Sequence, residues 1–193
     1  MTKLVVVITI FSFCFSFSQE AEFAAIDNEI KERLQKINRT YRKNPNLRAK
    51  AKFDLNQYKR NYYQDIINGI RLKEKPIYPE KNIGEPTKNA HYEGGIQKYS
   101  SLFLSVFVAW NFEDSNKKYQ AYVSFIIDKD GIAKNAQATG DDPDFNQECL
   151  VAFYKIVNVG KWSPAEYNGK PIPSKYRFPV ILSFADRTKT LTD

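Results

Sequence analysis

The apolar residues of this chain repeat with one period in its first part and with another near its end. Within Glu20–Lys43, and again within Leu47–Ile70, they recur every three or four positions, which is typical of one face of an amphipathic helix. Within Tyr119–Asp128 and Tyr176–Phe184 they alternate, which is typical of a half-buried strand. The chain is therefore expected to belong to the α+β class.

The two helical segments are separated by a short polar turn at Asn44-Pro45-Asn46. Pro45 either ends the first helix or begins the second. We expect residues 19–72 to form an antiparallel helical hairpin. Each helix needs a partner for its apolar face: the other helix, the rest of the chain or a second copy.

The N-terminus predicts export. A short basic start, Met1-Thr2-Lys3, precedes the uncharged, mostly apolar run Leu4–Ser18. As a helix this run measures roughly 22 Å, less than the hydrocarbon core of about 30 Å. We predict that residues 1–18 are a signal peptide cleaved after Ser18, and that the protein is periplasmic or secreted. The alternative is an uncleaved helix that anchors the chain in the inner membrane.

Few residues are suited to catalysis. The chain has one histidine, His91, and Cys149 is the one cysteine after the predicted cleavage site. The sequence contains no phosphate-binding glycine loop and no metal-ligand motif. A hairpin turn and an acidic helix N-terminus account for the aspartates at 128–144. We expect a non-enzymatic protein with no catalytic residue, metal or cofactor.

The chain after residue 72 divides into a linker and a second domain. Residues 73–93 contain scattered proline, glycine and charge without a helical or strand period, which predicts a linker. The periods that follow predict helix, strand, strand, helix and strand, then a tail at 186–193. The expected segments are a helix at 96–112, strands at 119–128 and 132–139 around an Asp128–Gly131 turn, a helix from 141–144 to Gly160 with Asp144 and Gln147 as a capping box, and a strand at 176–184.

Several short motifs accompany these segments in a fixed order. They are Gly94-Gly95, Val123–Gly131 (VSFIIDKDG), Asp142-Pro143, Lys161–Ala165 (KWSPA), Asn168–Pro171 (NGKP) and Tyr176–Phe184 (YRFPVILSF). In this order they resemble the C-terminal domain of TonB-type proteins over residues 94–185. The resemblance implies a three-stranded antiparallel sheet with two helices on one face. Its motif residues Gly94, Gly95, Gly131, Trp162, Pro164, Asn168 and Gly169 are expected to be structural.

The final strand is the best candidate for function. Pro179 lacks an N–H, so it is tolerated mainly in an edge strand, and such an edge can accept a partner strand. The resemblance implies that the partner is an extended peptide of an outer-membrane receptor or transport component. The alternative is a core strand whose edge is covered by the chain itself or by a second copy. The expected binding residues are Arg177, Pro179, Val180, Ile181, Leu182, Ser183 and Phe184.

The formal net charge of +7 is concentrated in the first half of the chain. Residues 19–98 hold 17 basic and 11 acidic residues, whereas residues 99–193 hold 11 of each. A solvated helix face is the simplest explanation, with contact to an anionic membrane surface or an acidic partner as an alternative. Nucleic acid is not expected, because export removes the protein from the cytoplasm. We therefore expect an envelope protein-binding module; the alternative is an assembly factor that forms a homodimer through its N-terminal helices.

Overall fold

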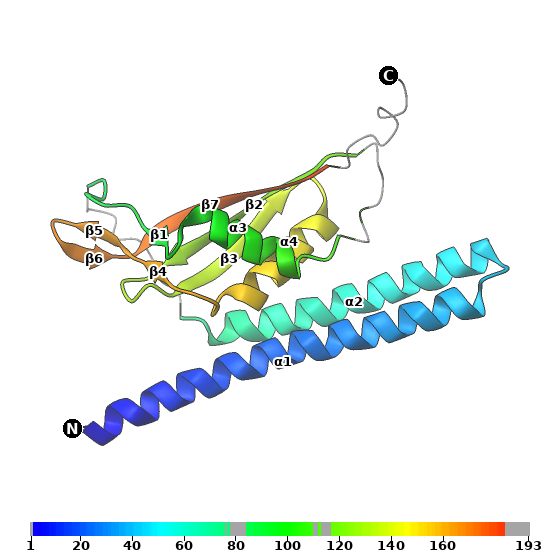
Figure 1. Cartoon of the computed structure of the whole chain (residues 1–193), viewed down its shortest axis with the longest axis horizontal. Coiled ribbons are helices and arrows are strands. Elements are labelled where there is room, and N and C mark those ends of the chain that lie inside the picture. The colour runs from blue at the N-terminus through cyan, green and yellow to red at the C-terminus, as the bar shows by residue number, and fades with distance from the viewer. Residues whose placement is uncertain (1, 76, 78–83, 110–111, 113–116, 184–193) are drawn as a thin grey trace. The chain divides into compact units, whose positions relative to one another are not determined.

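The computed structural model describes residues 2–75, 77, 84–109, 112 and 117–183, with side chains from residue 21 onward. The chain forms two compact units, Met1–Ile70 and Arg71–Asp193 (Figure 1). Helices precede a mixed helix-and-strand unit, so the expected α+β class is confirmed. Where side chains are described, no helix is both long and apolar enough to cross a membrane.

The first unit is the expected helical hairpin. Helix α1 (Thr2–Thr40) is continuous through the predicted leader, and α2 (Pro45–Lys73) follows after a four-residue turn. Pro45 begins α2 rather than ending α1. The side chain of Asn44 explains this boundary, because its Oδ1 accepts a hydrogen bond from the backbone N–H of Leu47 at 3.1 Å and so caps the new helix.

Contacts between side chains far apart in sequence show that α1 and α2 are antiparallel. The rings of Phe23 and Tyr63 meet edge to face at 5.9 Å between centroids, and the Tyr63 hydroxyl donates to Asp27. Closer to the turn, the Tyr58 hydroxyl donates to Glu29 at 3.1 Å. Phe23 and Tyr63 are almost fully buried, so the amphipathic stripes seen in the sequence are the packed faces of the helices.

The second unit is built on a three-stranded antiparallel sheet in the order β3-β2-β7. Its strands are β2 (Tyr119–Ile127), β3 (Ala133–Gly140) and β7 (Ser174–Leu182). The alternation in the sequence is also present in the structure, because every second residue of β2 is buried. β7 begins and ends two residues earlier than expected.

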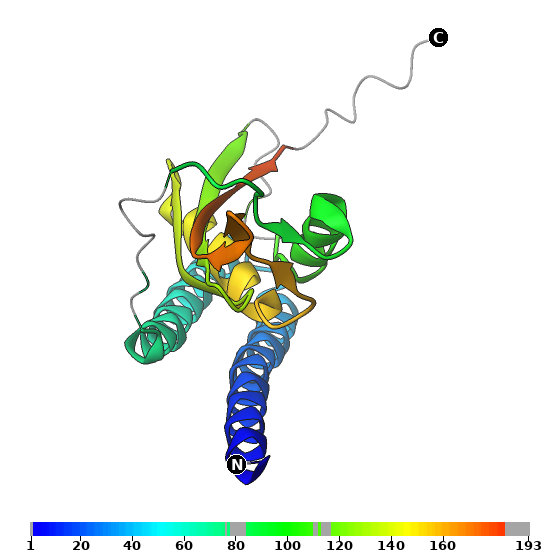
Figure 2. The ribbon, with the colours of Figure 1, turned by 90° about the vertical axis from the view of Figure 1, so that its left-hand side faces the viewer.

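Two helices pack on the buried face of this sheet, as the resemblance implies. They are α3 (Gly95–Val106) and α4 (Pro143–Ile156). Phe103 of α3 meets Phe178 of β7 at 5.3 Å, and Phe153 of α4 meets Phe125 of β2 at 4.9 Å. In the view of Figure 2, α3 (green) lies beside β7 (orange to red).

Two helix boundaries differ from the expectation. α3 ends at Val106 instead of 112, because Phe107 turns into an extended conformation and packs its ring on Phe112 and Phe145. The cap of α4 is Asp142 rather than Asp144, since the Asp142 carboxylate accepts from the N–H groups of Asp144 and Phe145. The expected capping box at Asp144 and Gln147 is therefore wrong, because the residue that caps the helix lies two positions earlier, at Asp142.

Short strands join the segment before α3 to the segment after α4. β1 (His91–Tyr92) pairs with β4 (Trp162–Ser163), and β5 (Ala165–Tyr167) forms a hairpin with β6 (Lys170–Ile172). Lys88 also exchanges backbone hydrogen bonds with Glu166. The end of the expected linker at 73–93 thus contains β1 and pairs with residues 161–166 of the second unit.

The motif residues occupy the positions that hold these pieces together. Gly131 has φ +77°, and a Cβ added there would lie 2.1 Å from the carbonyl oxygen of Trp162. The turn between β2 and β3 therefore packs directly against the Trp162–Pro164 segment. Gly94 and Gly95 lead into α3 with positive φ, and Asn168 and Gly169 form the turn of the β5–β6 hairpin, also with positive φ.

Candidate functional site: the free edge of β7

β7 is an edge strand, as Pro179 predicts. It pairs with β2 along its whole length, from Ser174 opposite Ile127 to Leu182 opposite Tyr119. Its other side has no strand partner among the described residues. Pro179 lies opposite Tyr122 near the middle of this ladder, so the residue without an N–H is placed in a strand that has one unpaired side.

The expected binding residues divide into two sets. Arg177, Pro179 and Ile181 are exposed, with 53% of Ile181 accessible, and Ser183 is also exposed just past the strand. Val180 is buried and Leu182 half-buried, since they share the face that packs on the helices. Phe184 lies outside the described residues. The first set is accessible to a partner, whereas Val180 and Leu182 belong to the core face.

A hollow of about 310 Å³ lies between α3 and β7. From α3 it is lined by residues spaced like one helix stripe, Ile96, Ser100 and Leu104. From β7 it is lined by Tyr176 to Ile181. Leu104 is 63% exposed and Ile96 36%, so this stripe presents apolar surface that the described chain leaves uncovered.

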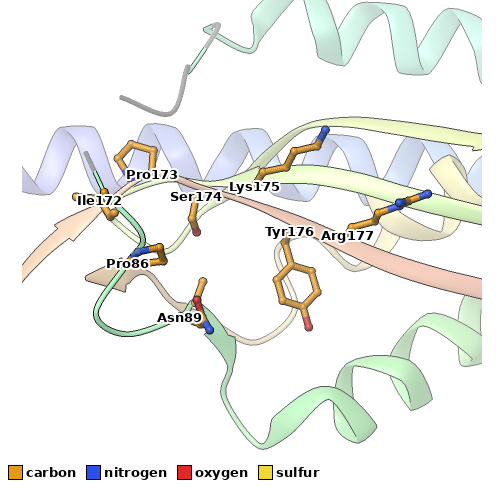
Figure 3. A pocket seen from close by; sticks show the side chains of 10 residues that line it. Pro86, Asn89, Ile172, Pro173, Ser174, Lys175, Tyr176 and Arg177 are labelled. Carbon is orange, nitrogen blue, oxygen red and sulfur yellow. The ribbon is translucent and has the colours of Figure 1, made fainter. Parts of the chain in front are cut away.

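A second hollow, of about 480 Å³, continues along the start of β7. Pro86, Asn89 and their neighbours form one wall, and residues 172–177 form the other (Figure 3). Figure 3 shows Ser174 and Tyr176 pointing to one side of the strand, and Lys175 and Arg177 to the other. The Ser174 hydroxyl oxygen is buried and has no hydrogen-bond partner in the described part of the chain.

The two hollows share Tyr176 and Arg177, so together they run from Ile172, at the end of β6, along β7 to Ile181. At about 3.3 Å per residue, this edge is roughly 30 Å long. An extended peptide of about nine residues spans such a length. We call these two adjoining hollows, which lie along a strand with one unpaired side, the channel.

Packed aromatic rings lie beneath the channel. Tyr99 of α3 meets Trp162 at 5.2 Å and Phe178 at 5.2 Å, and Trp162 meets Tyr176 at 4.6 Å. Burial raises the pKa of both the Tyr99 and Tyr176 hydroxyls above the usual range of a tyrosine. These phenols stay neutral at physiological pH, so the floor is apolar and uncharged.

The charges near the edge are positive. Lys175 and Arg177 are both exposed on β7. The Arg177 guanidinium lies 3.7 Å from the centroid of the Tyr122 ring, on the face of the sheet opposite α3 and α4. A cation–π contact of this kind fixes the arginine while leaving its charge accessible.

Cys149 and His91, the candidates for catalysis in the sequence, lie in different elements, α4 and β1. Cys149 is fully buried in α4, and its burial, with a smaller effect of the Glu148 charge, raises the pKa of the thiol far above its usual value. His91 is exposed in β1. Among the described residues, no group of three or more His, Cys, Asp or Glu side chains is placed to hold a metal ion.

Comparison with protein-family models, with curated proteins and with solved structures finds no match to this chain. The resemblance to the TonB C-terminal domain therefore rests on the order of the sequence motifs alone.

Sequence reasoning missed the wall opposite β7. Ile96, Ser100 and Leu104 were part of an expected helix but not of the expected site, and residues 84–90 were assigned to a linker. A signal for the first exists in the sequence: the α3 segment has apolar residues on more of its circumference than one packed face needs. The position of 84–90 depends on pairing with Glu166, which no local pattern reveals.

Proposed function

We propose that the Arg71–Asp193 unit is a non-enzymatic protein-binding module that takes up an extended peptide by strand addition at the free edge of β7. We further propose that it works in the periplasm or outside the cell after removal of residues 1–18, with an uncleaved N-terminal anchor as the alternative. The partner class that the TonB resemblance names is an outer-membrane receptor or transport component.

The observation that carries the proposal is the channel along β7. A peptide lying there meets unpaired backbone on one side and the apolar stripe Ile96–Leu104 on the other. Main-chain hydrogen bonds supply affinity in this mode of binding, and pockets for alternate side chains supply specificity. The hollows on either side of Tyr176 provide two such pockets.

The position of Pro179 indicates which backbone groups are available. Its missing N–H costs no ladder hydrogen bond if that position faces away from β2. Backbone groups alternate along a strand, so Arg177 and Ile181 then also direct their N–H and C=O groups to the free edge, whereas Phe178 and Val180 bond to β2. A peptide would bond to Arg177 and Ile181.

Lysine, arginine and proline in an edge strand also discourage unspecific pairing. Lys175, Arg177 and Pro179 fit that role as well. The apolar stripe of α3 favours peptide binding over protection of the edge alone, because protection does not require an exposed leucine and isoleucine beside the strand. Ile96, Leu104 and Ile181 are all exposed around the same hollow.

The test is crosslinking from inside the channel. A photoreactive phenylalanine analogue at Leu104 is placed in the otherwise native chain, expressed in its own host envelope, and crosslinked products are identified by mass spectrometry. We expect one partner, joined through an extended segment. Ile181→Pro removes one edge N–H and should lower the yield at least tenfold, whereas Ile181→Thr keeps the N–H and should preserve most of it.

The same analogue at Gln137 provides the matched control, because Gln137 is exposed on β3 at the opposite edge of the sheet. Equal crosslinking from positions 104 and 137, or an unchanged yield with Ile181→Pro, would show that β7 does not pair with the partner.

A second candidate function is assembly of two copies through the helical hairpin. Exposed aromatic side chains favour it, since Phe53 is 62% and Tyr62 43% accessible on α2. Light scattering separates the two proposals. A dimer that dissociates on Phe53→Ser and Tyr62→Ser supports the assembly function, whereas a monomeric chain refutes it.

A further inference from the structure

The turn of the helical hairpin carries an uninterrupted group of positive charges. Between Leu34 and Phe53 the sequence contains seven basic residues and no acidic one. The flanking carboxylates are Glu32 and Asp54. We call these seven residues the basic tip: Lys36, Arg39, Arg42, Lys43, Arg48, Lys50 and Lys52.

The charge of the basic tip is available to a partner. Five of its residues are exposed, and Arg48 and Lys52 are half-buried. Within the described chain, none of the seven forms an ion pair with a carboxylate. Arg33, one turn farther along α1, shows the contrast: it pairs with Glu29 at 2.5 Å and its guanidinium lies 4.3 Å from the centroid of the Tyr58 ring.

The seven charges are close enough to act together. On either side of the turn, successive basic residues are at most three positions apart, which is about 5 Å along a helix at 1.5 Å per residue. This is shorter than the Debye length of about 8 Å at physiological ionic strength. The turn lies at the end of the hairpin opposite the N-terminus of α1 (Figure 1). The field of the first unit is therefore strongest at that end.

Apolar side chains stand among these cations. Leu47, in the first turn of α2, is 49% exposed, and Phe53 is 62% exposed. Such residues are normally turned inward in an amphipathic helix, and neither contributes to the packing of α2 in the way that Leu55 does. Cations with interleaved leucine and phenylalanine are the composition of segments that lie in a lipid headgroup region.

We propose that the basic tip is a docking surface for an anionic lipid bilayer. The lysines and arginines contact the lipid phosphates, while Leu47 and Phe53 enter the boundary between headgroups and acyl chains. A nucleic acid would meet the same charges, but it has no apolar layer for Leu47, so the lipid surface uses more of what the tip presents.

The test is binding of the full chain to lipid vesicles, at lipid concentrations where about half of the protein is bound. We expect stronger binding to phosphatidylcholine vesicles that contain 30% phosphatidylglycerol than to pure phosphatidylcholine. The apolar segment 4–18 adds equally to every variant, so ratios are compared. Removing one lysine near an anionic surface weakens binding about fivefold, so Lys43→Gln with Lys50→Gln should weaken it about thirtyfold.

The matched control is Lys129→Gln with Lys161→Gln, which removes the same charge from two exposed positions of the second unit. It should leave vesicle binding within twofold of the native chain. Circular dichroism checks that each variant keeps its helices. Equal binding to both vesicle types, or an equal loss in the control variant, would overturn the proposal.

Leu47→Ser with Phe53→Ser distinguishes lipid from a general polyanion. These changes should weaken binding to phosphatidylglycerol vesicles several-fold and leave binding to duplex DNA unchanged. If the native chain binds duplex DNA as tightly as the vesicles, and the serine variant weakens neither, the tip is a polyanion site and the lipid proposal is wrong.

Discussion

Replacing Gly131 by alanine tests whether the β2–β3 turn is locked against the Trp162 segment. The added Cβ would lie 2.1 Å from the Trp162 carbonyl oxygen, which is a backbone atom that cannot rotate away. Gly131 also has φ +77°, a conformation that an alanine adopts only with strain. Two independent penalties therefore act at one residue.

The two penalties have different sizes. The left-handed conformation costs an alanine about 1–2 kcal/mol. Relieving the contact requires a backbone shift, which costs about 1–3 kcal/mol by comparison with overpacked cores. We expect Gly131→Ala to lower the free energy of unfolding of the second unit by about 3 kcal/mol, and its melting temperature by roughly 10 °C.

Tryptophan fluorescence during thermal and urea unfolding measures this change. Both tryptophans of the chain, Trp110 and Trp162, belong to the second unit, so the signal reports on that unit alone. Gly169→Ala is the matched control. Gly169 has the same φ of +77°, but nothing lies within 4 Å of its added Cβ, so only the conformational penalty of about 1–2 kcal/mol should appear. Equal destabilisation by the two substitutions would refute the locked contact.

Three further predictions concern charge and burial in the second unit. Asp142→Ala removes the cap of α4 and the 2.7 Å ion pair with Lys117, and should lower the free energy of unfolding by about 1–2 kcal/mol at pH 7. Burial opposes ionisation of Asp142, but the hydrogen bonds from Lys117 and from the helix N–H groups outweigh it and lower the pKa. The stabilisation by Asp142 is therefore present above about pH 4 and is lost at lower pH. In urea titrations, the difference in free energy of unfolding between the native chain and Asp142→Ala should shrink as the pH is lowered below about 4. Burial raises the pKa of Glu74, and the hydrogen bond from the Asn135 N–H partly offsets this. The contribution of Glu74 to the free energy of unfolding is therefore full below about pH 4 and falls at higher pH, so the native chain should lose stability relative to Glu74→Gln as the pH is raised above about 4. The Cys149 thiol should react with a maleimide at the rate at which the unit opens, and rapid labelling of the folded chain would contradict its burial.

The sequence was informative where one residue dominates its local structure. Asn44-Pro45 marks the break between the two helices in the sequence, and the structure then assigns Pro45 to the start of α2, with Asn44 as its cap. Pro179 identified an edge strand for the same reason: it lacks a donor wherever it is placed. The alternation in β2 follows from a sheet with one buried face.

The sequence was uninformative where structure depends on distant partners. β1 contains two residues, and its stability comes from pairing with Trp162 and from the Tyr92 ring, which packs 5.3 Å from the Trp162 ring. Such a strand leaves no periodic pattern. The channel wall at Ile96 and Leu104 was missed because exposure of an apolar residue is visible only after the packed face, Tyr99 and Phe103, is known.

Strand addition at the free edge of β7 is tested most directly by amide hydrogen exchange resolved at single residues by NMR. In the free protein, the amides of Arg177 and Ile181 should exchange rapidly and those of Phe178 and Val180 slowly. When the peptide segment identified by crosslinking at position 104 is added, Arg177 and Ile181 should become protected. Slow exchange at all four positions in the free protein, or no new protection at Arg177 and Ile181 in the complex, would contradict strand addition at β7.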